Sequence, residues 1–62
     1  MKLRKLIDHL KKHGVKLMRE GGNHSVYFNP STELYSTVPR HKEINDELAF
    51  RICKQLGIPK PK

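Results

Sequence analysis

The stretch VKLMREGGNHSVYFNPSTELYSTVP, residues 15–39, decides the fold of this chain. Its apolar and aromatic residues form short runs that are separated by Gly21-Gly22 and by Asn29-Pro30-Ser31, both of which are turn-forming sequences. The runs predict strands over residues 15–20, 23–29 and 34–38. Because consecutive strands with short connections usually pair as neighbours, we expect an antiparallel meander.

A helix is predicted on the N-terminal side of these strands. Leu3, Leu6, Ile7 and Leu10 recur at the helical spacing, with basic residues between them, and Gly14 can end the helix after His13. No residue that could cap the helix precedes Leu3. We therefore expect the first residues, 1–3, to fray.

A second helix is predicted on the C-terminal side, where Asn45 can cap its start and Gly57 can end it. Its apolar stripe consists of Leu48, Ala49, Ile52, Cys53 and Leu56. Two prolines interrupt the last residues, 59–62, which we expect to form a loose basic tail.

The order helix, three strands, helix predicts an α+β fold with one domain over residues 1–62. Two amphipathic helices and a small sheet can bury their apolar faces together only if both helices cover the same face of the sheet. We therefore expect a two-layer sandwich whose second sheet face is open to water.

Composition restricts the function. The chain has 62 residues and a formal net charge of +7, which favours nucleic acid, an anionic membrane surface or an acidic protein as partner. The apolar stripe of the first helix holds only Leu and Ile, which favours a core position over a membrane surface, and no apolar run could span a bilayer. A single cysteine, Cys53, excludes an intramolecular disulfide and suits a reducing cytoplasm.

Gly21-Gly22-Asn23-His24-Ser25 is the most informative local segment. Its glycines would let backbone N–H groups approach a phosphate, and histidine is the side chain best suited to proton transfer near neutral pH. The alternative is an ordinary hairpin turn with a surface histidine.

A second candidate anion site precedes the second helix. Arg40, His41 and Lys42 lie where unpaired N–H groups favour an anion, although Asp46 and Glu47 weaken that field. The alternative is a solvated loop.

Two other groups favour structural interpretations. His9 and His13 lie four residues apart, but no further ligand completes a metal site, so a solvated helix face is preferred. Cys53 falls on an apolar stripe and is predicted to be buried. No metal and no cofactor are predicted.

Three segments together resemble the HicA family of toxins from bacterial and archaeal toxin–antitoxin pairs: Gly22-Asn23-His24 with Val26 and Tyr27, residues 37–41 (TVPRH), and residues 52–58 (ICKQLGI). The resemblance implies a fold like that of double-stranded-RNA-binding domains and ribonuclease activity on mRNA. It also implies that His24 is the catalytic residue and that the partner is a HicB-like antitoxin.

The leading hypothesis is therefore a small, metal-independent endoribonuclease, an mRNA interferase, with His24 as its catalytic residue. The residues expected to contact RNA are Gly22, Asn23, Lys11, Lys12, Arg40, His41 and Lys42. His41 is a second candidate for a role in the chemistry. The alternatives from other classes are a noncatalytic RNA-binding module and a structural adaptor for an acidic protein.

Overall fold

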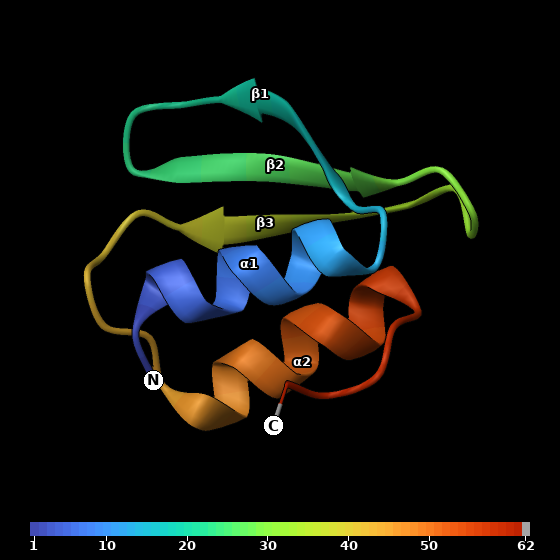
Figure 1. Cartoon of the computed structure of the whole chain (residues 1–62). Helices are drawn as coiled ribbons and strands as arrows, with labels where there is room; N and C mark the ends of the chain where they lie inside the picture. The colour runs from blue at the N-terminus through green and yellow to red at the C-terminus, as the bar shows by residue number, and fades with distance from the viewer. Residues whose placement is uncertain (62) are drawn as a thin grey trace.

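The computed structural model describes residues 1–61 and has the predicted order of elements (Figure 1). The elements are α1 (Leu3–Lys12), β1 (Lys16–Glu20), β2 (His24–Asn29), β3 (Leu34–Pro39) and α2 (Asp46–Leu56). The strands form one antiparallel sheet in the order β1-β2-β3. The α+β class and the resemblance to double-stranded-RNA-binding domains are confirmed.

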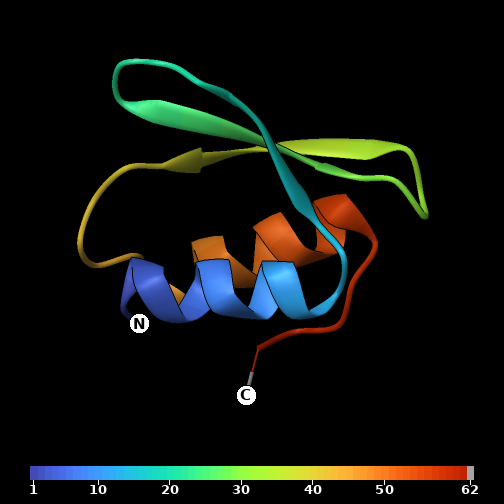
Figure 2. The same cartoon turned by 45° about the horizontal axis from the view of Figure 1, so that its top comes forward.

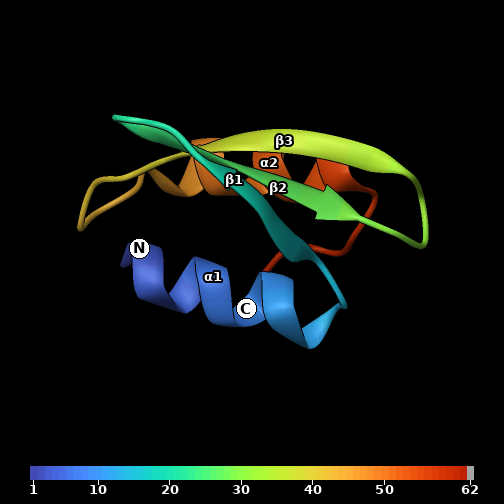
Figure 3. The same cartoon turned by 90° about the horizontal axis from the view of Figure 1, so that it is seen from above.

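Both helices lie on one side of the sheet, as Figure 2 shows, and α2 runs alongside β3 (Figure 3). The core between the two layers consists of Leu6, Leu10, Val15, Tyr27, Val38, Ile44, Ala49, Ile52, Cys53 and Leu56. Within residues 1–61, neither helix has the length and apolar character needed to cross a membrane.

The second helix begins and ends at the predicted residues. The Asn45 side chain accepts a hydrogen bond from the Glu47 backbone N–H at 2.8 Å, which caps the N-terminus of α2. Gly57 ends the helix in the left-handed conformation, with φ of 73°. A side chain there would be strained and would also meet the Thr32 methyl group at 2.9 Å.

The expected fraying of residues 1–3 is wrong. The terminal amine of Met1 donates to the Ile44 carbonyl and to the Asp46 carboxylate, both at 2.8 Å. Backbone bonds from Leu3 N–H to Lys42 O and from Ile44 N–H to Met1 O add to this contact. The segment that precedes α2 therefore replaces the missing side-chain cap of α1.

The prediction of a loose tail over residues 59–62 is also wrong for residues 59–61, which the structure describes. The Pro59 carbonyl oxygen lies 2.7 Å from His9 Nε2, and because a carbonyl can only accept, that nitrogen carries the proton. The Lys60 ammonium lies 5.1 Å from the centre of the Phe50 ring, and Pro61 is buried. Residues 59–61 thus pack back onto both helices, and Lys62 lies outside the described residues.

The first strand is the least buried element, since all of its residues are exposed. Lys16 and Leu17 pair with Phe28 and Tyr27, but Arg19 pairs with Val26, so Met18 is an extra residue in the ladder. Such a bulge shifts the following side chains to the opposite face of the sheet.

Candidate functional site

His24 is the first residue of β2 and its side chain is exposed. Ser25, Tyr27 and Asn29 on the same strand are buried toward the helices. Because side chains alternate along a strand, His24 belongs to the outer face of the sheet, away from the helical layer.

The turn before His24 is closed tightly. The Gly21 N–H donates to the His24 carbonyl at 2.8 Å, and a Cβ on Gly21 would lie only 3.0 Å from that oxygen. Nothing lies within 4 Å of the place where a Gly22 side chain would be. The backbone at Gly22 is therefore accessible to a ligand that approaches His24.

A shallow hollow surrounds this turn. It is lined by Arg19, Gly21, Gly22, Asn23, His24, Val26 and Thr37. The sequence analysis missed Arg19, because only the bulge at Met18 brings its side chain to the outer face. No signal in the sequence distinguishes that register from a regular one.

Arg40, the residue directly after β3, holds the turn in place through two hydrogen bonds. Its guanidinium Nη1 donates to the Gly21 carbonyl at 3.2 Å, and its backbone N–H donates to the Asn23 carbonyl at 2.9 Å. The end of β3 therefore holds the segment that precedes His24, and Arg40 is a positioning residue for it.

A larger groove lies between α1 and the connection from β3 to α2. Its lining includes four of the predicted RNA-contacting residues, Lys11, Arg40, His41 and Lys42, together with Lys2 and Arg4. Three carboxylates, from Asp8, Glu20 and Glu43, also line it and weaken its positive field. Lys12, although adjacent to Lys11, does not line this groove.

The predicted residues thus fall into two neighbouring places. Gly22, Asn23 and His24 lie at the hollow on the outer face of the sheet, whereas His41 lies in the groove beside α1. Arg40 lines the groove and hydrogen-bonds to the turn of the hollow, so it connects the two.

Tyr27 lines the groove and is buried. Burial raises the pKa of its phenol, the negative charge of Glu20 raises it further, and the positive charge of Arg40 opposes both effects. The phenol is therefore kept neutral over an extended alkaline range.

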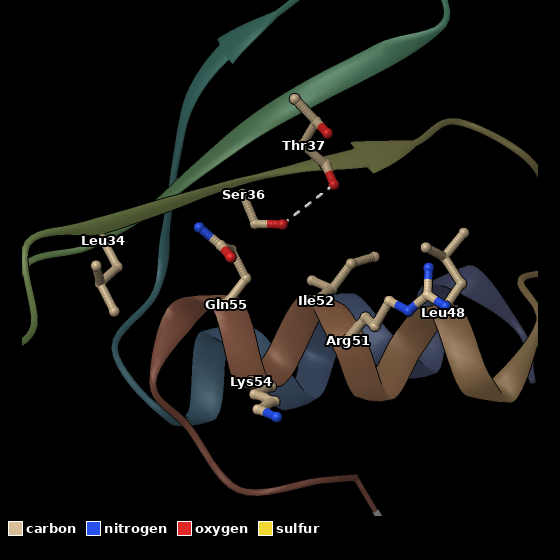
Figure 4. A pocket seen from close by; sticks show the side chains of 8 residues that line it. All are labelled: Leu34, Ser36, Thr37, Leu48, Arg51, Ile52, Lys54 and Gln55. Atoms are coloured by element: carbon tan, nitrogen blue, oxygen red, sulfur yellow. Dashed lines mark hydrogen bonds between the residues drawn. The ribbon is translucent and has the colours of Figure 1, made fainter.

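Another hollow lies between β3 and α2 (Figure 4). Leu34, Leu48 and Ile52 give it apolar walls, and Arg51 at its edge is 3.7 Å from the Glu47 carboxylate. It holds no histidine, and of its lining residues only Thr37 also borders the hollow at His24.

The histidines of α1 have a structural contact. The His9 and His13 rings lie 4.6 Å apart, and His9 binds the Pro59 carbonyl. Among residues 1–61, no three His, Cys, Asp or Glu side chains gather as a ligand set for a metal ion. Cys53 is buried as predicted, and burial raises the pKa of its thiol.

Comparison with protein families gives a match, over residues 3–58, to the family described as the HicA toxin of bacterial toxin–antitoxin systems. No curated protein and no solved structure gives a match to the chain. The match covers both helices and the whole sheet, including the turn that carries His24. The chain therefore belongs to the HicA toxin family.

Proposed function

We propose that this chain is an RNA-cleaving toxin, a metal-independent endoribonuclease that acts on mRNA with His24 as its catalytic residue. The observation that carries the proposal is the exposed imidazole of His24 beside the accessible backbone of Gly22, in a hollow that Arg19 also lines. Family membership and the net charge of +7 support it.

The chemistry needs no cofactor. The RNA 2′-hydroxyl attacks the adjacent phosphorus, the bond to the 5′-oxygen of the next nucleotide breaks, and a 2′,3′-cyclic phosphate forms. His24 would take the proton from the 2′-hydroxyl or give one to the leaving 5′-oxygen. Arg19 and the backbone near Gly22 would hold the phosphate as its charge rises.

The direct test compares His24→Ala with the parent chain. We expect cleavage to fall by about 100-fold or more, because the proton transfer is lost. Since the side chain is exposed, the free energy of unfolding should change by no more than about 0.5 kcal/mol. The matched control is His13→Ala, which removes an imidazole that lines neither the hollow nor the groove and should retain most of the cleavage.

Equal cleavage by the His24→Ala variant and the parent would contradict the proposal and favour a noncatalytic RNA-binding module. Cleavage should also persist in excess chelator, with a 2′,3′-cyclic phosphate on the product. Loss of activity in chelator, restored by one divalent ion, would instead indicate a metal-dependent nuclease.

The proposal includes a HicB-like antitoxin that covers His24 and the basic groove beside it. A domain with a charge of +7 attracts an acidic partner, and a partner that binds only the folded chain stabilises it. RNA should compete with this partner, and the melting temperature should rise with partner concentration. We place the pair in the cytoplasm, where the single thiol of Cys53 stays reduced.

A further inference from the structure

The outer face of the sheet carries two aromatic side chains that the core does not use. Phe28 on β2 and Tyr35 on β3 are directly paired in the register, and their ring centres lie 5.2 Å apart at an interplanar angle of 55°. Tyr35 is 54% exposed, the largest exposure among the large hydrophobic residues that the structure describes. A tilted pair of rings at this spacing is a favourable aromatic contact, and the Tyr35 ring remains open to a ligand.

Positive charge flanks these rings. Lys16 on β1 pairs with Phe28, so one row across the outer face reads Lys16, Phe28, Tyr35. The next row reads Arg19, Val26, Thr37, and His24 follows on the same face. No carboxylate stands at a paired position of this face, since Glu20 pairs with Ser25, which is buried toward the helices.

The rings lie within reach of a ligand held at His24. Phe28 is on the same strand and the same face as His24, four residues along, which corresponds to about 13 Å. The surface between them is formed by Val26 and Thr37, which line the hollow at His24. The aromatic pair and the histidine thus belong to one continuous surface.

We propose that this surface, formed by Lys16, Arg19, Phe28 and Tyr35 beside His24, binds single-stranded RNA. One base stacks on the exposed Tyr35 ring, against which the Phe28 ring packs, while Lys16 and Arg19 contact phosphates along the strand. The proposal rests on the proposed function and adds the substrate class to it. A duplex keeps its bases paired inside the helix, so only an unpaired base can stack on these rings.

The test measures binding without cleavage. The probe is a 2′-O-methyl RNA of about eight nucleotides, a length typical for such surfaces, which lacks the attacking hydroxyl. It carries one 2-aminopurine, whose fluorescence is quenched by stacking, and it is measured alone and annealed to its complement. The chains compared are the parent, Tyr35→Ala, Tyr35→Phe and Leu34→Ala.

Tyr35→Ala should weaken binding of the single strand by about 5-fold to 100-fold and remove the quenching. Tyr35→Phe keeps the ring and should bind like the parent. Leu34→Ala is the matched control, because Leu34 is also exposed (40%) but lies on the adjacent position of β3, whose side chain points to the other face. The parent should prefer the single strand to the duplex.

Two results would overturn the proposal. One is equal affinity of the parent for single strand and duplex, and the other is unchanged binding by Tyr35→Ala. Cleavage of ordinary RNA is measured separately, so the two proposals can fail independently. If the parent cleaves RNA but Tyr35→Ala binds the probe as well as the parent does, the stacking surface is contradicted and the nuclease is not. If binding depends on Tyr35 but the parent does not cleave RNA, the nuclease is contradicted and the stacking surface is not.

Discussion

At the scale of single residues, Asn29 joins the turn after β2 to the end of α2. Its side chain is 2% exposed, donates to the Leu56 carbonyl at 2.7 Å and accepts from the Ser31 N–H at 3.0 Å. Asn29→Leu removes the acceptor of the Ser31 N–H and leaves the Leu56 carbonyl with the Thr32 hydroxyl, at 3.0 Å, as its side-chain donor. This change should lower the free energy of unfolding by about 1–3 kcal/mol, measured by urea titration. Ser36→Ala, which removes an exposed 3.3 Å contact, is the control and should change it by less than about 0.5 kcal/mol. If both variants lose the same free energy of unfolding, the hydrogen bonds of Asn29 do not stabilise the chain more than the exposed contact of Ser36 does.

Tyr27 makes the free energy of unfolding depend on pH under alkaline conditions. Burial and the charge of Glu20 raise the pKa of its phenol in the folded chain, so the unfolded chain releases this proton first as pH rises. The contribution of Tyr27 to stability is therefore complete below its ordinary pKa of about 10 and is lost as pH rises through the folded value.

Urea midpoints measured from about pH 8 to about pH 11 should thus fall less steeply for Tyr27→Phe than for the parent. Tyr35→Phe is the control, since it removes an exposed hydroxyl, and it should reproduce the parent profile. An unchanged slope for Tyr27→Phe would assign the alkaline loss to other groups.

At the scale of the elements, α2 supplies much of the core and depends on a local cap. Ala49, Ile52, Cys53 and Leu56 are buried, and the first turn of this helix is held by the Asn45 side chain. Asn45→Ala should lower the free energy of unfolding by about 1 kcal/mol. Asn45→Asp keeps an oxygen acceptor for the Glu47 N–H and should stay close to the parent. If thermal melting shows equal losses for both variants, the hydrogen bond at the cap is not the source of the stabilisation.

At the scale of the whole molecule, the net charge of +7 predicts that the proposed RNA binding depends on salt. Lys11 lines the groove beside α1 whereas its neighbour Lys12 does not, so the two form a matched pair. Lys11→Gln should reduce the slope of log affinity against log salt by about 0.7, the value for one lost phosphate contact on a single strand. Lys12→Gln should reduce it much less. Equal effects would show that only the overall charge matters and that the groove makes no contact of its own.

The sequence alone determined the features that depend on neighbouring residues. Helical periodicity placed both helices, and Asn45 and Gly57 marked the ends of the second one, because caps and turns involve residues only a few positions apart. The turn at Gly21-Gly22 and the position of His24 directly after it are local for the same reason. The elements and their order could therefore be predicted before any contact between distant segments was known.

Only the tertiary structure decided features that join segments far apart in the chain. The bulge at Met18 brings Arg19, and not Glu20, to the face of His24, although a regular register fits the same alternating residues. The contacts of Met1 with Ile44, and of His9 with Pro59, fix two ends that were expected to be loose. Such contacts join residues more than forty positions apart, and no local pattern encodes them. Their geometry follows from how the two layers pack, which is set by the fold as a whole.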